Sequence, residues 1–448
     1  METSRVDHIP DNDLARFAFQ PDTLSSERRS EIRSHTTACE YCRTIADFFA
    51  LADDDLVWER TVGSATRDTL SAYAAQFAKE DKEAEALLQP LFENPAKAAW
   101  TNIATKKKFL TGGVVRRLTT HAHEIFENQP LDALTFADAA VSVAEGLQDD
   151  AYPAKAVFEW RGAAWKERAN SLMLLGRCDE ALESLTYAEQ AYRRLNSPGL
   201  GLACVALARA SVLYQQQQLD EATALAERAE HGFKHLGDDE RAMTALYLRA
   251  GIYYEAGQID RAASLFHQVV AHGEAIKSLR WFARGSYMLG NCEIDRGNIG
   301  EASLRFHAAL PVFREIGPAN ERISTEWGIA RLLLHAGKYD EAIRRLIEVA
   351  AEFEARGMIT DAALVNLDRI DALLALGRTE RIVELASRLF HVFTAAHMLT
   401  SALTAFSYIK EAAAAGTLTR TTLQAVRQFI RRARHQQDLL FQPPSKNL

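Results

Sequence analysis

The amino-acid sequence predicts an all-α protein, with a small helical head at the N-terminus followed by a solenoid of about seven or eight antiparallel helix pairs. Three observations support this fold class. A period of 40 residues runs through most of the chain, small residues recur at fixed positions within each period, and His35, Cys39 and Cys42 form a compact group of metal-ligand types near the N-terminus. A constant period of this size is typical of solenoids, whose units pack only against their neighbours.

Length and composition agree with this fold class. A chain of 448 residues exceeds what one ordinary hydrophobic core supports, unless it is a repeat array. The net charge is −8 with both signs mixed throughout, which argues against a general nucleic-acid or membrane binder. No run of eighteen apolar residues occurs and the N-terminus has no apolar signal core, so we expect a cytoplasmic protein with reduced thiols.

The first element is a metal-ligand motif, His35-x3-Cys39-x2-Cys42. His35 and Cys39 are four residues apart, so they share one face of a helix. Cys39 and Cys42 have the spacing with which two thiolates hold one tetrahedral zinc ion. His8 is the candidate fourth ligand, which would complete a structural His2Cys2 site without an open position. The alternative is two unrelated thiols beside a surface imidazole.

The surroundings of this motif carry a family resemblance. Leu14, the polar segment 25–29, Ile32 and the His-x3-Cys-x2-Cys motif resemble the zinc-binding anti-sigma domain of bacteria. The resemblance covers about residues 5–50, and we expect a zinc-finger domain over residues 1–50. It implies a transcription partner for this head, with a sigma factor as the candidate.

The second element is a polar segment over residues 51–112 with a helical pattern. We expect it to form one or two helices that join the head to the repeats. Pro90 and Pro95 are expected to break these helices, because proline lacks the backbone N–H that a helix interior needs.

The third element is the repeat array. Its anchor residues, one in each period, are Gly176, Gln217, Gly257, Gly297, Gly337 and Gly377. Alanine stands five residues after the first five anchors, at Ala181, Ala222, Ala262, Ala302 and Ala342. Small residues stand seven before the same anchors, and a large apolar residue stands nine after most of them. Small residues let two helices approach closely, and the large residue fills the space between units.

Turn signals delimit each repeat. Gly237, Gly317 and Gly357 stand twenty residues after an anchor and are expected to end second helices in the left-handed conformation, with Asn196 as a substitute. The Asp-Glu-Ala sequence after several anchors is expected to supply a helix N-cap and an acidic first turn.

These columns resemble the tetratricopeptide repeat over residues 113–396, with units of 40 residues instead of the consensus 34. A weaker pair is expected over 121–147. A last pair is expected within 397–448, which ends in a basic tail. The basic stretch from Arg420 onwards is either a local basic patch or a capping helix with a solvated outer face.

By the pattern of this repeat, one set of side chains faces inward along the first helices. They are Lys166, Asn170, Tyr214, Tyr247, Tyr254, Tyr287, Asn291, Trp327 and Arg331. A concave face with aromatics and amides suits a peptide or partner helix. The alternative is that several of these rings pack between helices. A column of arginines at 168, 209, 249 and 369 is either an anion-binding stripe or an exposed charge ladder.

No sequence motif of an enzyme is present: the chain has no nucleophile elbow, dinucleotide fingerprint or metalloprotease helix. Cys178, Cys204 and Cys292 lie inside repeats, where we expect them to fill small apolar spaces. The expected function is therefore a non-enzymatic regulator, with a zinc head for a transcription partner and an array for a protein or peptide. Two alternatives stay open: a scaffold whose finger is purely structural, and a peptide-sensing tetratricopeptide regulator.

Overall fold

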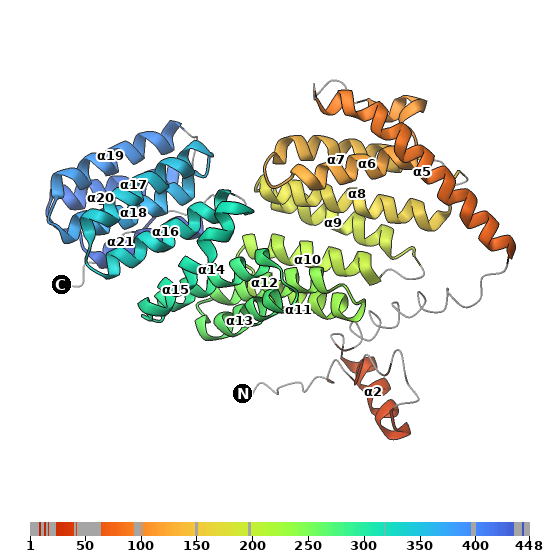
Figure 1. Cartoon of the computed structure of the whole chain (residues 1–448), viewed down its shortest axis with the longest axis horizontal. Coiled ribbons are helices and arrows are strands. Elements are labelled where there is room, and N and C mark those ends of the chain that lie inside the picture. Colours follow the sequence, from red (N-terminus) through yellow and green to blue (C-terminus); the bar gives the residue numbers. More distant parts are fainter. Residues whose placement is uncertain are drawn as a thin grey trace. The chain divides into compact units, whose positions relative to one another are not determined.

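The computed structural model describes residues 9, 13–14, 17, 24–39, 42, 64–93, 100, 102–147, 151–195, 199–317, 319–395, 400–433 and 441–442. All regular structure in these ranges is helical, so the predicted fold class, an all-α tetratricopeptide-like solenoid, is confirmed. The chain divides into two compact units, Met1–Leu248 and Arg249–Leu448, which are described one at a time. Within each unit, consecutive helices form antiparallel pairs (Figure 1).

The head contributes helix α2 (Ser26–Ala38), and the segment before the repeats contains α5 (Ser64–Phe92) and two short 3-10 turns, η4 (Ile103–Thr105) and η5 (Lys107–Phe109). Eight helix pairs follow within the described ranges. They are α6 (Gly112–Ile125) with α7 (Pro130–Glu145), α8 (Ala154–Leu174) with α9 (Cys178–Tyr192), α10 (Gly199–Gln215) with α11 (Leu219–His235), α12 (Asp239–Glu255) with α13 (Ile259–Ala275), α14 (Leu279–Asp295) with α15 (Ile299–Glu315), α16 (Ala319–His335) with α17 (Tyr339–Ala355), α18 (Ile359–Ala375) with α19 (Thr379–Ala395), and α20 (Thr400–Ala414) with α21 (Arg420–Ala433).

The backbone confirms the register of the repeats. Every anchor residue lies in the left-handed region between the two helices of its pair, with φ between 62° and 81°. Glycine adopts this conformation without steric cost, which explains why it recurs at the anchors. Gln217 adopts it as well, at φ 62°, although a side chain disfavours it. The repeat geometry therefore holds even where the preferred residue is missing.

The predicted small and large columns form the packed interior of each pair. The five alanines after the anchors are fully buried, as are Phe266 and Phe306. Gly290 shows how closely the helices approach, because a Cβ atom there would lie 2.7 Å from the Phe306 ring. The spacing of small residues thus sets the distance between the paired helices.

Ala302→Leu is expected to lower the free energy of unfolding by roughly 1–3 kcal/mol, because the added carbons meet a close-packed helix pair. Ala308→Leu is the matched control, since Ala308 lies exposed on the same helix, α15. Chemical denaturation followed by circular dichroism measures both. Equal, neutral effects at the two positions would contradict the register.

Three local predictions are wrong. Gly237 and Gly357 adopt the left-handed conformation, but Gly317 does not. A Cβ atom at Gly317 would lie only 2.6 Å from the Phe313 ring. The acidic residues after the anchors lie in the first helical turn but do not cap it. Helix α5 continues through Pro90 to Phe92, since a proline in the last turn removes one backbone hydrogen bond only. Asn196 and Pro95 lie outside the described residues.

The helix before the repeats packs onto the first pair. Glu80 of α5 accepts hydrogen bonds from the Gly113 amide at 3.2 Å and from the Tyr152 hydroxyl at 3.0 Å. The Tyr152 hydroxyl in turn accepts from the Gly112 amide at 3.0 Å. A Cβ at Gly113 would lie 2.5 Å from the Glu80 backbone, so only glycine permits this contact. Glu80 of α5 thus satisfies one free backbone amide at the N-terminus of α6, beside the N-cap residue Thr111.

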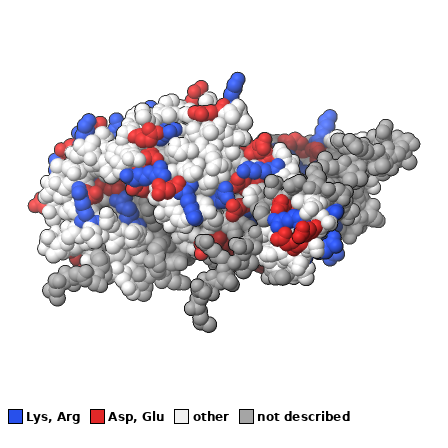
Figure 2. Space-filling view, turned by 90° about the horizontal axis from the view of Figure 1, so that it is seen from below, with Lys and Arg blue, Asp and Glu red and all other residues white. Residues whose placement is uncertain are grey.

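The surface carries both signs of charge. Figure 2 shows basic and acidic side chains interspersed on the face that it draws, in agreement with the mixed charge pattern of the sequence. Among the described helices, none has the length and apolar character needed to cross a membrane.

Candidate functional site

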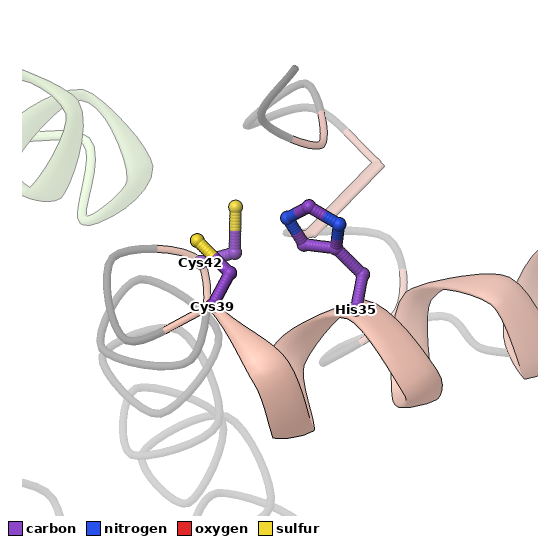
Figure 3. A group of neighbouring side chains, drawn as sticks. All are labelled: His35, Cys39 and Cys42. Atoms are coloured by element: carbon purple, nitrogen blue, oxygen red, sulfur yellow. The ribbon is translucent and has the colours of Figure 1, made fainter. Parts of the chain in front are cut away.

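The head brings three predicted zinc ligands together. The ligand atoms of His35, Cys39 and Cys42 all lie within 4.8 Å of one another, and the imidazole and both thiols point to the same side (Figure 3). His35 lies in the last turn of α2, and Cys39 is the C-cap residue of that helix, whose amide donates to the His35 carbonyl at 2.7 Å. The end of α2 therefore positions two of the three groups. His8 lies outside the described residues.

These residues fit a zinc ion. The Nε2 atom of His35 is buried and has no hydrogen-bond partner among the described residues, as expected for a nitrogen reserved for a metal. Thiolate and imidazole are the usual zinc ligands, and a tetrahedral site places its ligand atoms about 3.5–4 Å apart. The apolar core of this small head includes Leu14 and Ile32, both fully buried. A core of this size gains substantially from a bound metal.

In the first unit, the predicted inward residues Lys166 and Asn170 meet at a buried carboxylate that the sequence reasoning missed. Glu167 is 3% exposed and accepts from Lys166 Nζ at 2.5 Å, from Asn170 Nδ2 at 2.9 Å and from His123 Nδ1 at 3.1 Å. Burial raises the pKa of Glu167, but Lys166 and His123 outweigh it and lower that pKa to about 2. Glu167 is therefore an anion at neutral pH, where it holds Lys166 in place.

In the second unit, polar side chains of successive first helices contact one another. The Tyr254 hydroxyl donates to Asp295 at 2.6 Å. Arg331 Nη1 donates to Asn291 Oδ1 at 3.4 Å, and Arg331 Nη2 lies 3.7 Å from Asp295 Oδ1. Trp327 Nε1 donates to Asp368 at 2.6 Å. We call these six residues the inner row: Tyr254, Asn291, Asp295, Trp327, Arg331 and Asp368.

Charge is concentrated at the end of the inner row. Asp368 is 3% exposed. Its burial raises its pKa, but Arg427 and Arg331 more than compensate, so the pKa lies below its usual range. Burial lowers the pKa of the Arg331 guanidinium, but Asp368, Tyr254 and Asp295 outweigh burial and raise that pKa above its usual value. Both residues are therefore charged where water is largely excluded.

The inner row borders a pocket of about 730 Å³. Helices α14, α16, α18 and α21 and the start of α17 contribute its lining, which includes Asp295, Arg331, His335, Asp371, Gln424 and Gln428. A pocket of this size with both charges and amide groups can accommodate several residues of a peptide.

The aromatic residues predicted on the inner face have mixed environments. Tyr287 and Trp327 are half-buried, and their rings lie 6.1 Å from Phe306 and 6.3 Å from Phe353. Both rings thus contribute to packing inside their helix pairs, in line with the alternative that these rings pack between helices. Tyr214 and Tyr247 are half-buried in the first unit. Tyr254 lies in the inner row.

The missed residues share one signal. Glu167 and Asp368 both stand nine residues before an anchor, where the other repeats have Ala208, Leu248, Met288 and Gly328. An acid in an otherwise apolar or small column marks a buried charge with a dedicated partner.

In the arginine column, Arg168 pairs with Asp138 at 2.7 Å and Arg209 with Glu189 at 3.0 Å, which favours the charge ladder for these two.

No family model matches the chain, and no curated protein matches it. Among solved structures, the chain is similar to aspartyl phosphate phosphatase F from Bacillus subtilis, with 13% identity, a TM-score of 0.49, and coverage of 96% of this chain and 97% of that one. The apo form of the quorum sensor NprR from B. thuringiensis matches at 12% identity and a TM-score of 0.47, over 76% of this chain and 98% of that one. A Rap protein complexed with competence and sporulation factor matches at 15% identity and a TM-score of 0.44, over 71% of this chain and 99% of that one.

Proposed function

We propose that this chain is a non-enzymatic regulatory protein whose inner row binds a peptide or a segment of a partner protein. The observation that carries the proposal is the row itself, with the pocket of about 730 Å³ beside it. The row offers an indole, a phenol, an amide and a guanidinium from consecutive first helices. Trp, Tyr and Arg side chains dominate the binding energy of protein interfaces.

Arg331→Ala is expected to weaken capture of the partner at least about tenfold, because a charged group from the centre of the row is lost. The tagged full chain would be used to capture partners from the native cell, and mass spectrometry would identify them. The affinity of the purified partner would then be measured by calorimetry. Arg344→Ala is the matched control, since Arg344 is exposed on the second helix α17. Equal affinity of both variants would contradict this function.

For the head, we propose a structural zinc ion held by His35, Cys39 and Cys42, with His8 as the fourth ligand. The finer proposal is that the zinc-bound head contacts a transcription partner, and the resemblance to the anti-sigma domain supports a sigma factor. A Cys42→Ser variant is expected to lose that partner in the capture experiment while it keeps the partner of the inner row. The scaffold alternative expects both partners to be retained.

A further inference from the structure

Helix α21 differs from the other second helices in what it contacts. Helices α9, α15, α17 and α19 each pack on their own first helix and on the first helix of the next pair. Helix α21 packs on its own first helix, α20, and on α18, the first helix of the preceding pair. It therefore turns back toward the side of the second unit where the inner row lies.

The amphipathic pattern of α21 explains this position. Its apolar side chains Leu423, Val426, Phe429 and Ile430 are buried together with residues of α18 and α20. Its basic side chains Arg420 and Arg427 are seven residues apart, so they lie on one face, two turns from each other. One face of the helix is thus apolar and an adjacent face is cationic.

The cationic face pairs with carboxylates of α18. Arg427 Nη2 lies 2.5 Å from Asp368 Oδ1, and Arg420 Nε lies 2.9 Å from Asp371 Oδ1. The side chains of Arg427 and Asp368 are only 20% and 5% exposed. The Arg420 side chain, by contrast, is 59% exposed, so only Arg427 of this pair is largely removed from water. The buried Arg427–Asp368 pair and the exposed Arg420–Asp371 pair join the helix to α18.

Asp368 belongs to the inner row, so α21 occupies the end of the surface that we assign to a partner. The pocket beside the row is lined on one side by α21, through Arg420, Gln424 and Gln428, and extends from there to Asp295 and Arg331. The surface that receives α21 carries three carboxylates against one guanidinium: Asp368 and Asp371 contact α21, and Asp295 lies farther along beside Arg331. Charge complementarity therefore favours a cationic occupant.

We propose that α21 is an internal occupant of the inner row, and that the segment bound there from a partner is a basic amphipathic helix which takes its place. Such a helix carries two cationic side chains seven residues apart, opposite Asp368 and Asp371, beside an apolar stripe. The identity of the partner segment rests on the function proposed above, whereas the docking of α21 does not. Binding of the partner releases α21 from the second unit.

The test uses a fluorescein-labelled synthetic peptide of residues 417–433 and the full chain, with binding measured by fluorescence anisotropy. The double variant Arg420→Glu, Arg427→Glu places like charges opposite Asp371 and Asp368 and so weakens the hold on its own α21. We expect the peptide to bind this variant at least about tenfold more tightly than the unchanged chain, whose site is occupied. Circular dichroism of the variant checks that the array remains helical.

Two controls make the test specific. A peptide with the same two arginines changed to glutamate is expected not to bind, and adding Asp371→Arg to the double variant is expected to weaken binding of the native peptide. If the double charge reversal unfolds the second unit, the milder double variant Arg420→Gln, Arg427→Gln is used in its place. Hydrogen exchange over residues 420–433 is then expected to be faster in this variant than in the unchanged chain. Equal binding of native and reversed peptides, absence of binding to the loosened chain, or unchanged exchange would overturn the proposal. Specific peptide binding combined with partner capture that Arg331→Ala leaves unchanged would instead count against the proposed function alone.

Discussion

Cys39→Ser is expected to abolish zinc binding and unfold the head, while the repeats stay helical. The unchanged chain is expected to hold about one zinc ion per molecule, and structural zinc contributes on the order of 10 kcal/mol to the folding of a small domain. The buried core of the head is too small to replace that contribution, since it depends on a few side chains such as Leu14 and Ile32. Elemental analysis measures the metal, and limited proteolysis reports whether residues 1–50 are cleaved.

The matched control is Cys178→Ser, a half-buried thiol at the start of α9 that contacts Gln215. This variant is expected to keep the metal and the protease resistance of the head. Protein produced with zinc supplied but without bound zinc would rule out the metal site. Full zinc content in Cys39→Ser would show that the ligand set is wrong. A His8→Ala variant addresses the fourth ligand, with partial loss of zinc as the expected result.

The period of the array could be read from the sequence because helix packing repeats the same constraint in every unit. A buried alanine and a left-handed turn residue are required at the same places each time, so even Gln217 was identified by its position. The ends of the array lacked such repetition. The docking of α5 depends on the hydrogen bonds of Glu80 with Gly113 and Tyr152, which are 33 and 72 positions away. No periodic pattern in the sequence indicates these contacts.

The candidate site was predictable only in part. The candidate zinc ligands His35, Cys39 and Cys42 share one short segment, so their spacing alone predicted that they lie together. Inner-face residues such as Asn291 and Arg331 followed from the repeat position. Their partners did not, because a contact between successive repeats joins residues about 40 positions apart, and the contact of α21 with α18 skips a helix. Long-range pairs of this kind depend on tertiary packing and leave no local pattern.

Glu167→Gln is expected to destabilise the first unit by about 3–5 kcal/mol at neutral pH, because it leaves the ammonium of Lys166 buried without its anion. Lys166 Nζ lies 2.5 Å from Glu167 Oε1. Cys204 and Arg241 also act electrostatically on Lys166, and Arg241 adds a second positive charge nearby. Glu159→Gln is the matched control on the same helix, α8, since Glu159 is exposed. Urea denaturation of the full chain, followed by circular dichroism, measures both variants.

The same pair predicts a dependence on pH whose sign follows from the direction of the pKa shift. Because the pKa of Glu167 falls from its ordinary 4.5 to about 2 in the folded protein, its carboxylate stabilises the fold above about pH 4.5. That stabilisation is lost as the pH falls from about 4.5 toward about 2, where the folded state also takes up the proton. The stability difference between the unchanged chain and Glu167→Gln is therefore expected to shrink across this range. A difference that stays constant down to about pH 3 would mean that Glu167 acts through packing and not through its charge.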